Sequence, residues 1–175
     1  MVADQPDGIV LTRHRDLHGR SWHPWLRRAL VGIVALAAFL ALLGFVGQSP
    51  STTTAETAAA TLAVDSPNSV RGGLLYQARF TIVAHRALKD ATLVLNDRWI
   101  DGLTVNTIEP GPLNEASRDG SLALELGHLA AGAKYVLYLD YQVNPTTVGS
   151  RTLQTGLFDG EQPVASVSRS LRIWP

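Results

Sequence analysis

Residues 74–85 read LLYQARFTIVAH, and the alternation of side chains in this stretch indicates the fold of most of the chain. Apolar or small side chains occupy every second position, namely Tyr76, Ala78, Phe80, Ile82 and Ala84. Mostly polar side chains stand between them, and they include Arg79, Thr81 and His85. Successive side chains of a strand point to opposite faces, so the pattern predicts a β-strand with one buried face.

The same period of two recurs as far as the C-terminal end of the sequence. It is seen at Leu93 and Leu95, at Leu122, Leu124 and Leu126, at Tyr135, Leu137, Leu139, Tyr141 and Val143, and at Ala165, Val167, Arg169, Leu171 and Ile173. Arg169 interrupts the last apolar face, which an edge strand or a strand end would accommodate. Asp-Gly pairs at 101–102, 119–120 and 159–160 supply residues that tolerate positive φ in tight turns. Residues 59–175 are therefore predicted to form an antiparallel β-sandwich of seven to eight strands, and the chain is mainly β.

Residues 128–173 also resemble the C-terminal half of bacterial extracellular immunoglobulin-like repeat modules. The resemblance rests on a turn, a connection and a hairpin, formed by Leu129, Ala131 and Gly132, by Pro145 and Gly149, and by Asp159–Gly160. The whole layout is similar to that of uncharacterised single-pass membrane proteins of actinobacteria. The resemblance implies an immunoglobulin-like sandwich that is used for binding or spacing, and it carries over no catalytic residue.

A long apolar segment precedes this region. Residues 29–47, ALVGIVALAAFLALLGFVG, contain no charged side chain. As a helix they would span about 28 Å, close to the thickness of the hydrocarbon core of a bilayer. The apolar region of a cleavable signal peptide is shorter, about 7–15 residues, and a small-residue cleavage site follows it directly. The nearest such run is Ala58–Ala60, well beyond the segment. An uncleaved transmembrane signal anchor is therefore expected.

Basic residues predict the orientation of this segment. Five arginines lie in residues 1–28, and the first basic residue after the segment is Arg71. The positive-inside rule then places 1–28 in the cytoplasm as a basic arm, with 48–58 as a polar linker and 59–175 outside the plasma membrane. The expected membrane-interface residues are two tryptophans and two arginines, Trp22, Trp25, Arg27 and Arg28.

The sequence contains no motif that is typical of a catalytic, phosphate-binding or metal-binding site. It contains no cysteine, no phosphate-binding glycine loop, no nucleophile elbow and no metal-ligand motif. The formal net charge is zero, with no concentrated basic face of the kind that binds nucleic acid. His85 alternates onto a polar strand face, and His128 precedes a turn. We therefore expect no catalytic residue, no cofactor, no metal site and no nucleic-acid partner, and the protein is predicted not to be an enzyme.

Residues 96–102, NDRWIDG, form the most unusual local cluster. Its carboxylates make a calcium loop conceivable, but a charged loop with Trp99 folded onto the edge of the sandwich is favoured. Alternatively, Trp99 is an exposed anchor for a partner, together with Asp97 and Asp101. Glu115, in a predicted irregular connection at 109–120, is the fourth candidate contact residue. Burial of Trp99 would separate the two interpretations.

These observations favour a non-catalytic function at the cell envelope. The leading hypothesis is a membrane-anchored extracytoplasmic β-sandwich that acts as a binding or accessory subunit. Its expected partners are the lipid bilayer and another membrane or envelope protein. The alternative is an envelope sensor or signalling protein that relays through the transmembrane helix, although an arm of 28 residues without a folded domain argues against it.

Overall fold

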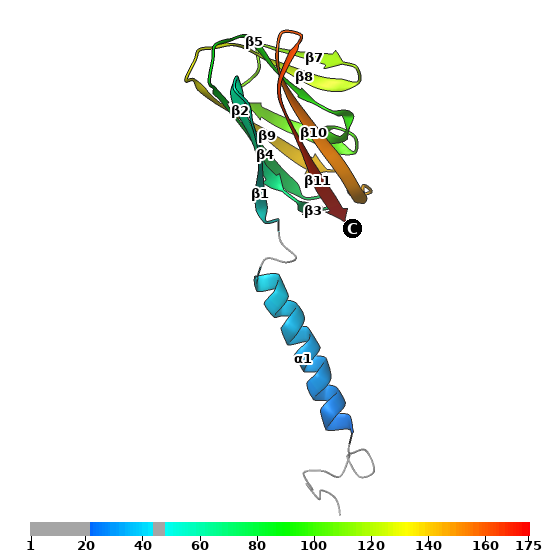
Figure 1. Ribbon diagram of the computed structural model, residues 1–175. Helices are drawn as coiled ribbons and strands as arrows, with labels where there is room; N and C mark the ends of the chain where they lie inside the picture. Colours follow the sequence, from blue (N-terminus) through cyan, green and yellow to red (C-terminus); the bar gives the residue numbers. More distant parts are fainter. Residues whose placement is uncertain (1–21, 44–47) are drawn as a thin grey trace, which may run out of the picture. The chain divides into compact units, whose positions relative to one another are not determined.

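A computed structural model describes residues 22–43 and 48–175 of the chain (Figure 1). The chain divides into two units, Met1–Val46 and Gly47–Pro175. Most of the predicted cytoplasmic arm, 1–28, and the last four residues of the predicted membrane segment, 29–47, lie outside the described residues.

The described part of the first unit, residues 22–43, forms the helix α1 (His23–Leu42). It begins six residues before the predicted start at Ala29, and Pro24 stands in its first turn, where the missing N–H of proline costs no hydrogen bond. No residue of α1 is buried, and the mean hydropathy of its most apolar window is 1.9. It is thus long and apolar enough to cross a membrane, as a membrane anchor or a signal sequence would be.

The second unit is a sandwich of two β-sheets (Figure 1). One sheet has five strands in the order β1 (Pro50–Glu56), β2 (Ala60–Pro67), β4 (Leu75–Ala84), β9 (Lys134–Val143) and β6 (Leu103–Glu109). The other has six in the order β3 (Ser69–Arg71), β11 (Gln162–Trp174), β10 (Gly149–Asp159), β5 (Leu88–Leu95), β8 (Ser121–Leu129) and β7 (Asn114–Arg118). The predicted mainly β sandwich is confirmed, but its eleven strands exceed the predicted seven to eight.

The additional strands lie at the edges of the sheets. Residues 50–56 form β1 where a polar linker, 48–58, was predicted, and β7 forms within the predicted irregular connection 109–120. The short edge strand β3 pairs with β11 in parallel, so the second sheet is mixed rather than purely antiparallel. The turn between β7 and β8 follows the prediction, because Asp119 and Gly120 adopt positive φ values of 51° and 78°.

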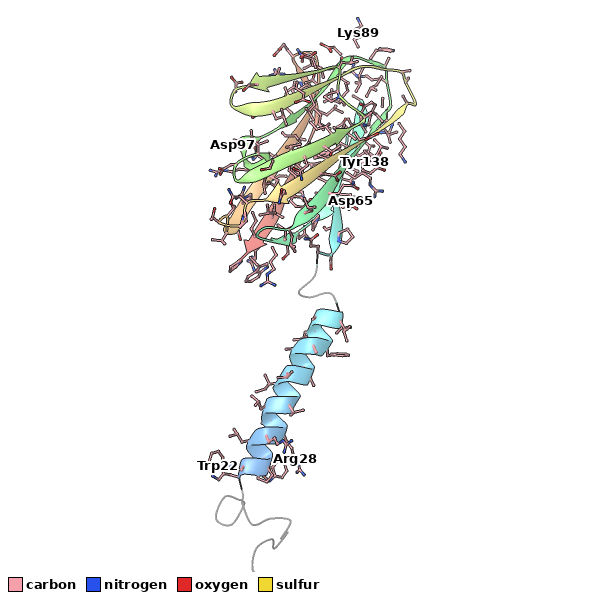
Figure 2. All side chains as sticks on the ribbon, turned by 180° about the vertical axis from the view of Figure 1, so that it is seen from behind. Trp22, Arg28, Asp65, Lys89, Asp97 and Tyr138 are labelled. Atoms are coloured by element: carbon pink, nitrogen blue, oxygen red, sulfur yellow. The ribbon has the colours of Figure 1, made fainter. Side chains whose placement is uncertain are left out.

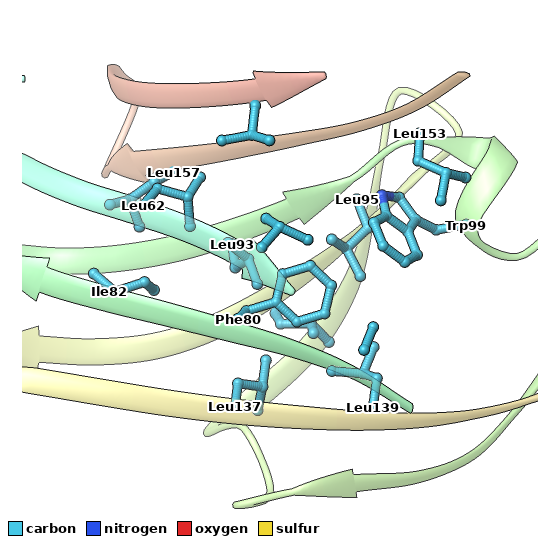
Figure 3. Packing of buried hydrophobic residues seen from close by; sticks show 14 of the residues in the cluster. Leu62, Phe80, Ile82, Leu93, Leu95, Trp99, Leu137, Leu139, Leu153 and Leu157 are labelled. Atoms are coloured by element: carbon cyan, nitrogen blue, oxygen red, sulfur yellow. The ribbon is translucent and has the colours of Figure 1, made fainter. Parts of the chain in front are cut away.

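The core lies between the two sheets, and the alternating residues predicted from the sequence form much of it (Figure 3). Along β4, all five predicted residues are buried, and from Leu137 to Val143 the predicted face of β9 is buried as well. Leu122 and Tyr135 are partly buried at the margin. Burial of one face on each sheet is what a period of two predicts, so the predicted inward faces of β4 and of most of β9 are confirmed.

Arg169 is the one charged side chain among the buried residues that the structure describes, and only 6% of its surface is exposed. At Arg169, β11 pairs with β10 alone, because β3 pairs with β11 only from Arg172 to Trp174, so the sheet edge predicted at this residue is confirmed. Its Nη1 donates to the carbonyl oxygens of Ser51 (3.0 Å) and Val64 (3.1 Å). Its Nη2 donates to the carbonyl of Ser66 and to Oδ1 of Asn68 (2.9 Å). Arg169 therefore joins the second sheet to β1 and β2 of the first.

An aromatic row continues the core toward Arg169. The ring centroids of Phe80 and Trp99 lie 5.3 Å apart, those of Trp99 and Tyr141 5.7 Å, and those of Tyr141 and Tyr76 5.2 Å. The hydroxyl groups of both tyrosines are buried without a hydrogen-bond partner among the described residues. Burial raises the pKa of each phenol, and for Tyr76 this outweighs the opposing attraction of Arg151 and Arg169.

Alkaline pH is therefore expected to unfold the sandwich. In the unfolded chain a tyrosine ionises near pH 10, whereas in the folded state Tyr76 and Tyr141 ionise at higher pH. Below pH 10 both tyrosines are protonated in either state and their contribution to the free energy of unfolding is complete. As the pH rises above 10, the unfolded chain ionises first, so this contribution is lost. Tyrosinate absorbance and circular dichroism, followed together through an alkaline titration, should show these two tyrosines ionising with unfolding. Tyr141→Phe should move the transition to higher pH, and an unchanged transition would contradict the assignment.

Because β1 belongs to the sandwich, residues 48–175 are expected to be more stable than residues 59–175. The shorter fragment lacks the strand that pairs with β2 from Pro50 to Glu56, and it lacks the Ser51 carbonyl that accepts from Arg169. That hydrogen bond to a charged group alone is worth about 1.5–3 kcal/mol. Urea denaturation of the two fragments should show a difference of at least this size. Equal midpoints would mean that β1 is not part of the folded unit.

Candidate functional site

The candidate contact residues in NDRWIDG lie on and beside a short 3₁₀ helix, η2 (Asp97–Trp99), between β5 and β6. Trp99 points inward and is completely buried. Figure 3 shows its ring beside Leu95 and Leu153. Its Nε1 donates to the carbonyl of Gln154 at 3.2 Å. Trp99 is therefore a core residue, which agrees with the favoured interpretation of a loop folded onto the sandwich, and its burial does not fit the alternative of an exposed anchor for a partner.

Asp97 and Asp101, which flank Trp99 in the sequence, lie on the surface (Figure 2 labels Asp97). Both carboxylates face Arg98, whose Nε lies 3.7 Å from Asp97 Oδ2 and whose Nη1 lies 3.2 Å from Asp101 Oδ2. Arg151 on β10 donates to the carbonyl oxygens of Arg98 and Asp101. These contacts link the loop to β10 and balance much of its negative charge.

An open polar groove of about 550 Å³ adjoins this loop. Its walls come from η2, β10 and β11, and they are formed by Asn96, Asp97, Arg98, Ser150, Arg151, Thr152, Gln154 and Ser170. Asn96 closes one side, because its side chain accepts from the backbone N–H of Gln154 (3.1 Å) and donates to the carbonyl of Thr152 (3.3 Å). The groove therefore offers hydrogen-bonding side chains and guanidinium groups to a polar ligand or peptide.

Glu115 lies on β7 and is exposed. A second, smaller hollow of about 220 Å³ connects it with the η2 loop, because Ile100 and Glu115 both line it. The fold thus brings the region of Asp101 toward Glu115. Sequence reasoning missed Arg151 and the residues of β10, since nothing in the chain near NDRWIDG points to a strand fifty residues away.

The two histidines of the sandwich lie apart from this surface. Both are exposed, and a ring nitrogen of His85 lies 2.8 Å from Oγ1 of Thr61. No carboxylate among the described residues is hydrogen-bonded to either ring, and the described residues hold no group of three potential metal ligands. The described surface therefore brings together polar contact groups rather than an acid–base pair.

The predicted membrane-interface residues lie at the start of α1. Trp22 directly precedes the helix, and Trp25, Arg27 and Arg28 stand in its first two turns. Both tryptophans are exposed, and the guanidinium carbon of Arg28 lies 5.4 Å from the ring centroid of Trp25 (Figure 2). Their position at a membrane interface remains a prediction.

The similarities of this chain to known proteins concern its fold alone. No family model matches the chain, and no curated protein matches it. Among solved structures, the CARDB domain of a Pyrococcus furiosus protein, in complex with di-metal ions, is 11% identical, with 71% of this chain and 88% of that chain covered and a TM-score of 0.42. The C-terminal domain of wzt is 15% identical, with coverages of 74% and 81% and a TM-score of 0.43. The human F-spondin reeler domain is 12% identical, with coverages of 62% and 82% and a TM-score of 0.39. The chain is similar to these β-sandwich domains in fold alone.

Proposed function

We propose that this protein is a membrane-anchored, non-catalytic β-sandwich that binds another protein of the cell envelope as an accessory subunit. The observation that carries the proposal is α1, a helix of 20 residues with high hydropathy and no buried residue. An apolar helix that has no buried residue among the described parts of the chain is stable when lipid surrounds it. The sandwich forms a separate unit with its own core, and such a unit can present a surface outside the bilayer.

The proposed orientation has the N-terminal arm in the cytoplasm and the sandwich outside. Support comes from the five arginines within residues 1–28 and from the absence of basic residues between Arg28 and Arg71. Trp22 and Trp25 would then lie at the cytoplasmic interface, with Arg27 and Arg28 among the lipid headgroups.

Cysteine labelling is expected to reveal this orientation, because the chain contains no cysteine of its own. In intact cells, a membrane-impermeant maleimide should label Ala131→Cys in the exposed turn before β9, and it should label Ala3→Cys only after the membrane is permeabilised. The reverse result would overturn the orientation. A mature chain that has lost its N-terminal segment would identify α1 as a cleaved signal sequence and would overturn the anchoring.

A non-catalytic role fits the chemistry of the candidate site. The surface around η2 offers hydrogen bonds and paired charges, and its carboxylates are held by Arg98. A general base needs a proton within hydrogen-bond reach and a pKa matched to its task. The two histidines of the sandwich, His85 and His128, are exposed and stand apart from this surface. A loop that is hydrogen-bonded to β10 beside a polar groove is better suited to recognition of a protein surface.

The binding role is tested by charge reversal. Asp97→Arg combined with Asp101→Arg places three arginines at positions 97, 98 and 101, which removes both carboxylate partners of Arg98. The full-length variant, solubilised from membranes, should lose proteins that co-purify with the wild-type chain. The matched control is Asp90→Arg, an exposed aspartate on β5. Equal recovery of partners from both variants would exclude this surface as the contact.

A further inference from the structure

Four large apolar side chains are exposed at one end of the sandwich. The exposed fractions are 47% for Leu74, 62% for Leu75, 58% for Val148 and 51% for Trp174. They come from the turn before β4 and its first residue, from the connection between β9 and β10, and from the end of β11. Single exposed apolar residues need no explanation, but a group of them at one end indicates a contact surface.

These three segments are neighbours in space. The backbone N–H of Gly72 donates to the carbonyl of Trp174 at 2.8 Å, and that of Gly73 donates to the carbonyl of Val143 at 3.0 Å. Gly149, directly after Val148, pairs with Ile173, directly before Trp174. We call Leu74, Leu75, Val148 and Trp174 the apolar end.

The chain enters the sandwich at the apolar end. The side chain of Gln48 donates to the carbonyl oxygen of Leu75 at 3.4 Å. Helix α1 ends at Leu42, so six peptide units join Leu42 to Gln48. A fully extended chain covers at most about 3.6 Å per residue, which limits the separation of these two residues to about 22 Å. If α1 spans a bilayer, Gln48 and the neighbouring apolar end are tethered within this reach of its outer surface.

The side chains around the apolar end suit a lipid headgroup layer. Tryptophan is enriched at membrane interfaces, where its ring is apolar and its N–H stays hydrated or hydrogen-bonded. Nε1 of Trp174 donates to Oγ of Ser69 at 2.9 Å, and the guanidinium carbon of Arg172 lies 5.5 Å from the ring centroid. Arg71 is exposed as well and donates to the carbonyl of Pro175. Two arginines beside apolar side chains combine insertion with attraction to phosphate groups.

We propose that the apolar end docks on the outer surface of the bilayer that α1 spans, with its four apolar side chains in the interfacial layer. This inference rests on the proposed membrane anchoring. The short chain that joins α1 to the sandwich favours lipid over any other partner of the apolar end. It holds the apolar end close to lipid at all times and so gives the bilayer a high effective concentration. A bilayer-docked sandwich would be held in one orientation, which would fix the direction in which the η2 surface meets its partner.

Single-cysteine probes test the docking in the full chain. Val148→Cys is labelled with an environment-sensitive fluorophore, and the protein is placed in nanodiscs of phosphatidylcholine and phosphatidylglycerol with or without doxyl-labelled lipid. Doxyl lipid should quench most of the fluorescence of the probe at position 148. The matched control, Ala131→Cys, lies in the turn at the opposite end of β9 and should lose almost none. A third probe, from Ala35→Cys in α1, reports the anchoring itself.

The three probes distinguish the possible failures. Quenching at position 35 without quenching at 148 would overturn the docking and leave the anchoring intact. Absence of quenching at position 35 would overturn both the anchoring and the docking. A probe at 148 that is shielded from water only when two chains share a nanodisc would identify a second copy as the occupant, which would also overturn the docking on lipid.

A charge substitution provides an independent test. Leu74→Glu combined with Leu75→Glu should abolish the quenching at position 148, because carboxylates are expelled from the interfacial layer and repelled by phosphatidylglycerol. The control is Leu113→Glu, an exposed leucine between β6 and β7, which should leave the quenching unchanged. Both positions in the double variant are exposed, so the thermal unfolding midpoint of the sandwich should be unaffected. Persistent quenching in the double variant would contradict the proposal.

Discussion

Replacement of Trp99 by alanine is expected to lower the free energy of unfolding of the sandwich by about 3–5 kcal/mol, the range for removal of a buried aromatic side chain. The ring is fully buried between Phe80 and Tyr141, and its Nε1 satisfies the carbonyl of Gln154. The substitution leaves a cavity beside two rings and removes one hydrogen bond. It also removes the contact that holds η2 against the core, so the loop that carries Asp97 and Asp101 should become mobile.

Urea denaturation of residues 48–175 measures this effect, and Trp174→Ala is the matched control. Trp174 is about half exposed, so its loss should cost much less than the loss of Trp99. Trp99→Phe should be intermediate, because it retains an aromatic ring but not the N–H donor. If Trp99→Ala cost less than about 1 kcal/mol, the ring would not be in the core, and its interpretation as a partner anchor would return.

The central strands were predictable because their side chains face two different environments. On β4 and β9 the inner face is buried and the outer face meets solvent, so the sequence alternates with a period of two. The β7–β8 hairpin turn was predictable for a different reason. Asp119 and Gly120 adopt the positive φ that such turns require, and few other residue pairs do so readily. In both cases a local pattern has a local physical cause.

The edge strands β1 and β7 were missed because they lack that pattern. No residue of β7 is buried, and most of the side chains of β1 are hydroxyl-bearing or small. Backbone hydrogen bonds to β8 and β2 hold these strands in place, and such bonds leave little trace in the order of side chains. Polar edge strands also discourage pairing with other chains, so a weak sequence signal is expected at the edges of a sandwich.

The candidate site was predicted in part. The polarity of Asp97 and Asp101 indicates exposure, and both carboxylates are on the surface. Whether Trp99 points inward or outward depends on residues of β4, β9 and β10, which form its pocket, and none of these is adjacent to it in the sequence. The same holds for Arg151, which supports the loop from β10.

Arg169 is the clearest case of a residue whose environment is set by distant parts of the chain. Its four acceptors come from residues 51–68, more than 100 positions away. An isolated arginine in an apolar strand face suggests exposure, because an unpaired buried charge is very costly. Here carbonyl dipoles surround the guanidinium in place of a carboxylate. Burial lowers the pKa of Arg169, while the nearby Asp65 and Tyr76 act in the opposite direction. Arginine nevertheless remains charged at any physiological pH.

Arg169→Ala is expected to destabilise the sandwich by about 3–5 kcal/mol, since it creates a cavity and leaves buried carbonyl oxygens without their donor. Arg169→Lys should recover little of this loss. A lysine ammonium is a compact charge with three donors, and it lacks the planar fork with which Nη1 and Nη2 reach acceptors on β1, β2 and the side chain of Asn68. Urea denaturation of residues 48–175 measures both changes. Arg172→Ala, an exposed arginine on the same strand, serves as the control and should change the stability by about 0.5 kcal/mol or less.

The same substitution should act most strongly on β1, the strand that follows α1 in the chain. β1 is an edge strand with one neighbour in its sheet, so Arg169 is its charged hydrogen-bond link to the opposite sheet. Hydrogen exchange of the β1 amides should therefore accelerate in Arg169→Ala before exchange in β4 or β9 does. In residues 59–175, where the Ser51 acceptor is missing, Arg169→Ala should cost less than in residues 48–175, because the two changes remove the same contact. Additive losses would mean that Arg169 stabilises β2 alone.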